Sequence, residues 1–246
     1  MSKFLIHGIQ GAMGKKVEEL LINEDIIGFD HHISHATLTV FNDWDDIEDV
    51  DMIIDFSHYT MVDSLLEYAV KTQTPCVICT TGLDASTQEK ILDASKHIPI
   101  FQSGNMSLGI NVLIEMAKLG AQSLNGFDVE IIEKHHNKKI DAPSGTAYML
   151  AEAIQSIQTS KEFIYGRVGT DAKREENTIG IHAVRGGSIT GEHNILFAGL
   201  DEIIELKHQA TSKSVFAKGA VEAAYYLMNK TPKLYNMSDL IKGGIS

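Results

Sequence analysis

Short apolar runs alternate with segments of helical spacing along the first part of the chain. The apolar runs have the length of strands and lie at residues 4–8, 26–29, 37–41, 51–56, 76–79 and 98–101. Between them, apolar residues recur every three or four positions at residues 15–22, 60–72 and 86–96, which is the period of an amphipathic helix. Strands that alternate with helices predict a parallel sheet wound in right-handed βαβ units.

The pattern changes after residue 106. Strand-like segments with glycine-marked turns lie at residues 127–133, 182–185, 188–197 and 202–208, and they predict an open mixed or antiparallel sheet. Residues 214–229 return to helical spacing, and we expect this helix to pack on the first domain. The sequence therefore predicts two domains, a parallel α/β domain of residues 1–106 completed by residues 214–246 and an α+β domain of residues 107–213.

The composition is that of an ordinary soluble globular protein, with 43% hydrophobic and 22% charged residues. The 33 acidic and 21 basic residues give a formal net charge of -12, which repels phosphate backbones and anionic lipids. We therefore expect no nucleic-acid or membrane partner, and an anionic substrate would need a local cluster of cations. Neither a signal-peptide core nor an apolar segment of membrane length is visible, so we expect a cytoplasmic protein.

The two cysteines, Cys76 and Cys79, lie in an apolar run with the C-x-x-C spacing of some zinc and redox sites. No second Cys or His pair stands at a companion spacing. We interpret both as buried strand thiols and expect no metal site.

A glycine-rich turn follows the first predicted strand. Gly8, Gly11 and Gly14 stand where backbone N–H groups and a helix start face the pyrophosphate of a dinucleotide. The spacing is G-x-x-G-x-x-G rather than G-x-G-x-x-G, so a plain βα turn is the alternative. The position of the turn at the start of a βαβ series favours dinucleotide binding.

The end of the second predicted strand carries the residues that would meet the adenosine ribose. Asp30 is the acidic residue expected to accept hydrogen bonds from the ribose. His31, His32 and His35 are donors that would suit a 2′-phosphate instead, and a crowded surface loop is the third possibility. The choice between NADH and NADPH stays open at this point.

A basic segment stands out in this acidic chain. Residues 134–139 hold three lysines and the pair His135 and His136, and Pro143 with Ser144 then marks a helix start. Free N–H groups at such a start bind carboxylates, and neighbouring histidines and lysines can deliver a proton. A solvated charge run is the alternative. A metal pair is weaker, because adjacent residues on a strand point to opposite faces.

Taken together, these motifs resemble the 4-hydroxy-tetrahydrodipicolinate reductase family of lysine and diaminopimelate biosynthesis. The resemblance runs through nearly the whole chain, and its most specific part is the stretch H-H-x-x-K-x-D-A-P-S-G-T from His135 to Thr146. The other matching segments are residues 8–14, 55–57, 80–82, 103–107 and 184–193. Cys79 stands where the family usually has glycine, and the family's Glu-Arg pair after the second strand is missing.

The resemblance implies a role for each matching site residue. His135 would be a catalytic proton donor or acceptor and Lys139 the proton donor, while His136, Gly145 and Thr146 would hold the substrate carboxylates. Asp30 and His31 join the cofactor site from the reasoning above. The remaining cofactor contacts that the resemblance implies are Gly8, Ile9, Gln10, Gly11, Ala12, Met13, Cys79, Thr80, Thr81, Ser103, Gly104, Asn105 and Met106.

The resemblance also implies the fold, the reaction and the assembly. We expect a Rossmann-like cofactor domain and a substrate domain whose sheet builds a homotetramer. The expected reaction is reduction of a cyclic dicarboxylate by NADH or NADPH, with loss of its hydroxyl as water. Two rival functions are a semialdehyde dehydrogenase, which needs a thiolate nucleophile, and a nucleotide-sensing module without catalysis.

Overall fold

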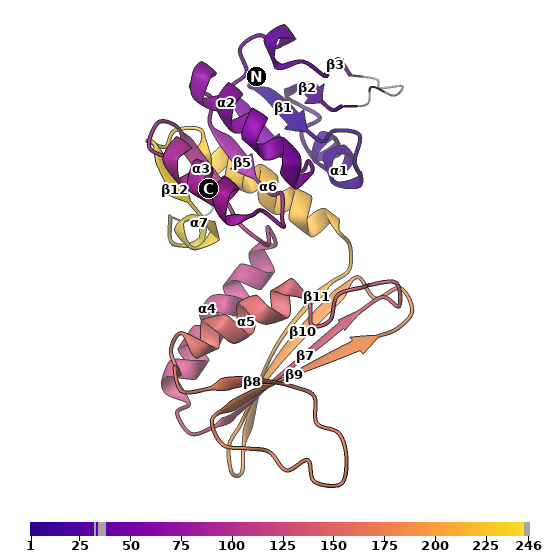
Figure 1. Ribbon diagram of the computed structural model, residues 1–246, viewed down its shortest axis with the longest axis vertical. Coiled ribbons are helices and arrows are strands. Elements are labelled where there is room, and N and C mark those ends of the chain that lie inside the picture. The colour runs from indigo at the N-terminus through magenta and orange to yellow at the C-terminus, as the bar shows by residue number, and fades with distance from the viewer. Residues whose placement is uncertain (32, 34–37, 244–246) are drawn as a thin grey trace. The chain divides into compact units, whose positions relative to one another are not determined.

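The computed structural model describes residues 1–31, 33 and 38–243 of the chain. It divides into two compact units, one of Met1–Leu108 with Ser214–Ser246 and the other of Gly109–Lys213. Figure 1 shows the elements of both units. The first of these is unit 1 and the second is unit 2.

Unit 1 is built on a parallel sheet of seven strands in the order β12-β6-β5-β4-β1-β2-β3. Every strand pairing in it is parallel, as the alternation of strands and helices predicts. The strands are β1 (Lys3–His7), β2 (Asp25–Phe29), β3 (Val40–Phe41), β4 (Met52–Asp55), β5 (Cys76–Ile78), β6 (Pro99–Gln102) and β12 (Lys233–Tyr235).

Helices cover both faces of this sheet. One core joins the sheet to α1 (Ala12–Leu20), α6 (Ser214–Leu227) and α7 (Met237–Gly243). The core on the other face includes α2 (Val62–Thr72) and α3 (Ala85–Ala94). Short 3-10 turns occupy Trp44–Asp46 and Tyr59–Met61. Helices on both faces explain why the strands of unit 1 are apolar at nearly every position. A strand that is buried on both faces carries hydrophobic side chains on both faces.

The helix α6 packs unusually closely against the backbone of unit 1. An ideal Cβ at Gly219 would lie 1.7 Å from the Met106 carbonyl oxygen, a distance that no real side chain tolerates. Only glycine at position 219 therefore allows α6 to pack this closely against the backbone of Met106, in the segment that follows β6.

Unit 2 has a mixed sheet of five strands in the order β11-β10-β7-β9-β8. β7 is parallel to β9 and antiparallel to β10, which confirms the open mixed sheet. The helices α4 (Leu108–Ser123) and α5 (Gly145–Gln155) pack on it through one hydrophobic core. The strands are β7 (Asp128–His135), β8 (Glu162–Tyr165), β9 (Thr178–Arg185), β10 (Gly191–Ala198) and β11 (Ile203–Ala210).

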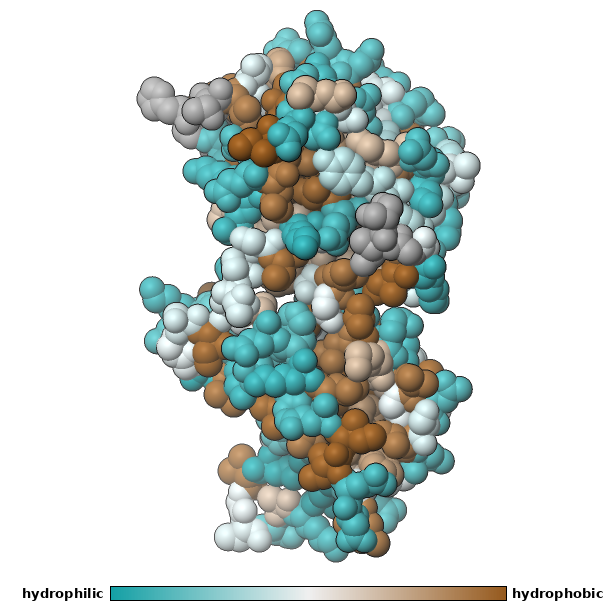
Figure 2. Space-filling view, turned by 180° about the vertical axis from the view of Figure 1, so that it is seen from behind, coloured by the Kyte–Doolittle hydropathy of each residue, from teal (hydrophilic) through white to brown (hydrophobic). Residues whose placement is uncertain are grey.

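Side chains alternate along β7 between the two faces of this sheet. Val129 and Ile131 are fully buried in the core with α4 and α5. Glu133 and His135 follow on the same face, so the apolar row ends in two polar residues. On the opposite face, where no helix of the described core lies, Val184 and Ile203 are exposed. On the side of the molecule seen in Figure 2, patches of hydrophobic side chains interrupt the polar surface.

Three predicted strands differ from the observed ones. The strand expected at residues 182–185 starts four residues earlier, at Thr178. The strand expected at residues 188–197 starts at Gly191, because the chain reverses at Gly187, whose φ is +47°. The strand expected at residues 37–41 is only Val40–Phe41 within the described residues. Among residues 1–31, 33 and 38–243, no helix has both the length and the apolar character needed to cross a membrane.

Candidate active site

The glycine turn between β1 and α1 has a backbone that other residues could not adopt. Gly8 has a φ of +81°, and its carbonyl accepts a hydrogen bond from the Gly11 N–H at 3.0 Å. An ideal Cβ at Gly14 would lie 2.3 Å from the Gly8 carbonyl oxygen. The third glycine thus lets α1 start directly against the turn, and the first N–H groups of α1 face the space above it.

A cavity of about 320 Å³ opens above this turn at the carboxyl ends of β1 and β4. The strand order reverses between these two strands, and open α/β sheets bind their ligands at such a switch point. Five predicted cofactor residues line the cavity: Gly8, Gln10, Gly11, Asp30 and His31. The prediction missed Phe56, Ser57, His58 and Met61, which also line it and follow β4.

Asp30 lies directly after β2 and contacts the glycine turn. Its Oδ2 accepts a hydrogen bond from the Gln10 N–H at 3.1 Å. The carboxylate is thus held beside the expected position of an adenosine ribose. His31 is exposed next to it, whereas His32 and His35 lie outside the described residues.

The other predicted cofactor residues follow the next two strands of the sheet. The Thr80 hydroxyl, just beyond β5, donates to the Ser57 carbonyl at 3.1 Å. The Ser103 hydroxyl, just beyond β6, donates to the Asn105 carbonyl at 2.9 Å. Cys79, Thr81, Gly104 and Met106 belong to the same two loops, and Ile9, Ala12 and Met13 to the glycine turn.

Three of the predicted cofactor residues have side chains buried in the core of unit 1: Ile9, Cys79 and Met106. They can meet a cofactor only through their backbone. Together with the glycine cradle, the cavity and Asp30, the loops of unit 1 fit a nicotinamide dinucleotide.

The cysteines are confirmed as buried thiols. Cys76 is fully buried and Cys79 is 7% exposed. Burial raises the pKa of both thiols, and the nearby negative charge of Asp55 raises it further. Neither thiol is ionised at neutral pH, so neither supplies the nucleophile of a semialdehyde dehydrogenase. No group of three or more metal-ligating side chains was found among the described residues.

In unit 2, the end of β7 carries a buried carboxylate with several partners. Glu133 Oε2 lies 2.6 Å from His135 Nδ1. Arg185, at the end of the neighbouring β9, donates from both terminal nitrogens to the two oxygens of Glu133 at 2.8 and 2.7 Å. Burial acts to raise the pKa of Glu133, but the hydrogen bonds from Arg185 and His135 outweigh it and the pKa lies below its usual value. Glu133 is therefore a carboxylate at neutral pH.

The start of α5 joins the same cluster. The Ser144 N–H donates to Glu133 Oε1 at 3.0 Å. The Ser144 hydroxyl caps α5 by accepting from the Ala147 N–H at 3.2 Å, and it lies 2.9 Å from His193 Nε2. Gly145 then begins the helix, with Thr146 next. The predicted carboxylate-binding helix start and His135, the predicted proton donor or acceptor, thus belong to one hydrogen-bonded cluster.

Lys139 and His136 lie in the loop between β7 and α5. Lys139 Nζ forms an ion pair with both oxygens of Asp141, at 2.7 and 2.9 Å. The Lys139 N–H donates to the His136 carbonyl at 3.1 Å, which makes a turn of this part of the loop. All five predicted catalytic and substrate residues therefore belong to one loop and its two flanking elements.

The prediction named Ser144 only as part of the helix start, and it gave no role to Glu133, Arg185 or His193. The alternation of strands offers one signal, because Glu133 is two residues before His135 and must share its face. Nothing local links Arg185 or His193 to them. Their place depends on the register of β9 and β10 against β7.

We expect His193 to make the stability of the protein depend on pH. Burial, and then the nearby charge of His135, lowers the pKa of His193 to about 4. An unfolded histidine has a pKa near ~6.5, so between pH ~6.5 and ~4 the unfolded chain binds a proton that the folded chain does not. The free energy of unfolding should therefore fall by about 3 kcal/mol as the pH is lowered across this window.

Urea unfolding from pH ~7 to ~4.5 measures this effect. The variant His193→Asn is the control, and its stability should fall less steeply over the same range. Parallel curves for the two proteins would contradict the assignment.

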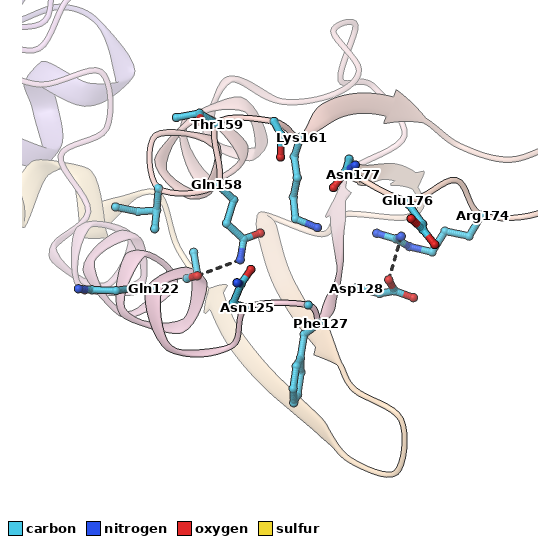
Figure 3. A pocket seen from close by; sticks show the side chains of 14 residues that line it. Gln122, Asn125, Phe127, Asp128, Gln158, Thr159, Lys161, Arg174, Glu176 and Asn177 are labelled. Carbon is cyan, nitrogen blue, oxygen red and sulfur yellow. Dashed lines mark hydrogen bonds and ion pairs between the residues drawn. The ribbon is translucent and has the colours of Figure 1, made fainter.

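A cavity of unit 2 lies at the end of β7 opposite to His135 (Figure 3). It has a volume of about 640 Å³, and Arg174 forms an ion pair with Asp128 there at 2.9 Å. Gln158 donates to the Ala121 carbonyl at 2.8 Å in the same cavity. The length of β7, about 23 Å, separates this cavity from His135, and no predicted site residue lines it. It is not part of the candidate active site.

Family models match both parts of the chain. The model described as dihydrodipicolinate reductase, N-terminus, matches residues 2–106. The model described as dihydrodipicolinate reductase, C-terminus, matches residues 109–241.

Individual relatives cover nearly the full chain. The 4-hydroxy-tetrahydrodipicolinate reductase of Caldanaerobacter subterraneus subsp. tengcongensis is 47% identical over 250 residues, which cover 99% of this chain and 100% of the relative. The reductase of the same name from Exiguobacterium sibiricum is 45% identical, over 97% of this chain and 96% of the relative. Among solved structures, a dipicolinate-bound dihydrodipicolinate reductase from Paenisporosarcina sp. TG-14 superposes with a TM-score of 0.80, at 24% identity over 96% of this chain and 97% of the other. This structural likeness confirms the fold.

Proposed function

The chain belongs to the dihydrodipicolinate reductase family, and on that premise we propose that it is a 4-hydroxy-tetrahydrodipicolinate reductase of lysine and diaminopimelate biosynthesis. The observation that carries this proposal is the 47% identity over the full length of a reductase of that name. The enzyme reduces 4-hydroxy-tetrahydrodipicolinate with NADH or NADPH and releases the hydroxyl as water, giving tetrahydrodipicolinate.

Substrate binding falls to unit 2. Gly145 and Thr146 stand at the start of α5, where the positive end of the helix dipole favours a carboxylate. His136 and Lys139 add positive or hydrogen-bonding groups on the loop that precedes the helix. The solved structure with bound dipicolinate, a small dicarboxylate, supports a ligand of this class.

Proton delivery falls to Lys139 and His135. The bound nicotinamide supplies the hydride. Loss of the hydroxyl as water needs a proton donor, and Lys139 fills that role with its ammonium group held by Asp141. His135 is the second proton donor or acceptor, with its Nδ1 against Glu133. A positioned acid or base of this kind contributes ~10²–10⁴-fold in rate.

Unit 1 binds the cofactor through the glycine turn and the loops that follow β5 and β6. We expect dual cofactor use or a mild preference for NADPH. The Asp30 carboxylate already accepts the Gln10 N–H, and His31 beside it can donate to a 2′-phosphate.

The proposed assembly is a homotetramer in the cytoplasm. The face of the unit 2 sheet that carries no helix supports it, because exposed Val184 and Ile203 on that face would be buried against another copy. Light scattering on the purified protein gives the mass of the assembly directly.

Steady-state kinetics test the function and the cofactor preference together. Purified protein supplied with synthase-generated substrate should oxidise both NADPH and NADH. We expect their kcat/KM values to differ by less than about tenfold, or about 1.4 kcal/mol. A strong preference for NADH would identify Asp30 as a ribose ligand. If the protein bound the cofactor but consumed neither form, it would be a nucleotide-sensing module instead.

A further inference from the structure

The buried Glu133 has a role of its own in this site. We propose that Glu133 is a positioning residue that sets the tautomer of His135 and ties His135 to the start of α5. The inference rests on the proposed function, because it assigns a task to Glu133 within the same reaction.

Four hydrogen bonds converge on the Glu133 carboxylate, which is fully buried. Oε1 accepts from Arg185 Nη2 and from the Ser144 N–H, at 2.7 and 3.0 Å. Oε2 accepts from Arg185 Nη1 and lies against His135 Nδ1, at 2.8 and 2.6 Å. A buried carboxylate that is ionised can only accept hydrogen bonds. The Nδ1 atom of His135 must therefore carry the proton that it shares with Glu133.

This arrangement decides which nitrogen of His135 is available for chemistry. With Nδ1 protonated, Nε2 is the atom that gives or takes a proton in the reaction. Gly191 leaves room at that atom, because an ideal Cβ at position 191 would lie 3.2 Å from His135 Nε2. The negative charge of Glu133 also stabilises the imidazolium form that exists when His135 holds a second proton.

The same carboxylate connects three separate segments of the site. It holds the ring of His135 on β7, the backbone of Ser144 at the cap of α5, and the guanidinium of Arg185 on β9. Arg185 Nη2 additionally donates to the Asp141 carbonyl at 2.7 Å, which ties the Lys139 loop to the cluster. The distance between the His135 ring and the carboxylate-binding start of α5 thus depends on Glu133.

The other charged or titratable groups around His135 come from neighbouring elements. His193 on β10 has its ring centroid 5.2 Å from that of His135. Lys139 and Asp141 lie in the following loop. Burial keeps His193 neutral at pH 7, so His193 adds no charge beside the His135 ring. Glu133 is the negatively charged group in direct contact with that ring.

The decisive variant is Glu133→Gln. A glutamine that accepts from Ser144 and Arg185 through its oxygen turns its NH₂ group toward His135 Nδ1. The His135 ring must then accept at Nδ1 and carry its proton on Nε2. We expect kcat to fall by ~10²-fold or more and the affinity for NADPH to stay unchanged.

The test combines kinetics with ¹⁵N NMR of the histidine rings, which distinguishes the two tautomers. The His135 signal is assigned by its loss in His135→Gln. The proposal expects the Nδ1–H form in the wild type and the Nε2–H form in Glu133→Gln. Glu133→Asp keeps the charge and should restore the Nδ1–H form with part of the activity. If Glu133→Gln fails to fold by circular dichroism, the comparison of Glu133→Asp with the wild type carries the test.

Glu130 offers a matched control on the same strand. It also bonds an arginine and a histidine, Arg167 at 2.9 Å and His182 at 2.7 Å, but on the opposite face of the sheet. Glu130→Gln should leave the His135 tautomer unchanged.

The outcomes separate the two proposals. The positioning role would be overturned by an active wild type whose His135 tautomer and kcat are unaffected by Glu133→Gln. A Glu133→Asp variant that lost the Nδ1–H form and as much activity as Glu133→Gln would overturn it as well. A wild type that oxidises neither cofactor overturns the proposed function instead, and its NMR spectrum still reports the tautomer.

Discussion

Replacing Lys139 with alanine is expected to lower kcat by ~10²–10⁴-fold, the usual contribution of a positioned general acid. The loss should fall on the chemical step, because Lys139 belongs to the substrate loop of unit 2 and the cofactor cavity belongs to unit 1. The dissociation constants of NADH and NADPH, measured by fluorescence titration, should stay within about twofold of the wild type.

A second variant distinguishes proton donation from charge. Lys139→Arg keeps the positive charge beside Asp141, but the guanidinium is a much weaker acid than an ammonium group and releases no proton near neutral pH. We expect Lys139→Arg to keep a KM near that of the wild type and to lose kcat almost as severely as alanine. If Lys139→Arg restored kcat, Lys139 would supply charge only. Equal losses of turnover and cofactor affinity in Lys139→Ala would instead indicate a positional role.

Of the variants proposed for this protein, Gly219→Ala should lose the most free energy of unfolding. Helix propensity alone favours alanine over glycine by about 1 kcal/mol. The structure predicts the opposite sign, because the new Cβ would lie 1.7 Å from the Met106 carbonyl oxygen. Overpacking of a core costs ~1–3 kcal/mol when side chains can adjust, and here a backbone atom must move.

Urea unfolding with Gly219→Ala measures the loss as a lower midpoint. Gly186→Ala is the control, since the nearest atom to an ideal Cβ there is 4.0 Å away, and its midpoint should hardly change. The displaced Met106 ends a predicted cofactor loop, so NADPH affinity should fall as well. A higher midpoint for Gly219→Ala would show that propensity dominates and that α6 can shift.

Much of this fold follows from the periodicity of the sequence. The alternating strands and helices of unit 1 and the start of α5 at Ser144 were predictable, because each rests on local spacing and capping chemistry. The strands β8 and β12 were not, since they are short edge strands with four and three residues and no clear alternation.

Part of the candidate site could likewise be predicted from the sequence, and part of it could not. The loop from His135 to Thr146 is continuous in sequence, so a motif was enough to predict it. Arg185 and His193 meet Glu133 only because β9 and β10 pair with β7 in a given register, and a single sequence does not specify that register.

The late position of α6 has a consequence for synthesis on the ribosome. β1 to β6 emerge first, but one face of their sheet is covered by Ser214–Leu227, which follows the whole of unit 2. At ~5–20 residues per second, translation of residues 109–213 takes roughly 5–20 s. During that interval one apolar face of the nascent sheet stays exposed, because α6 has not yet been synthesised. We expect chaperones that bind nascent chains to recognise this face.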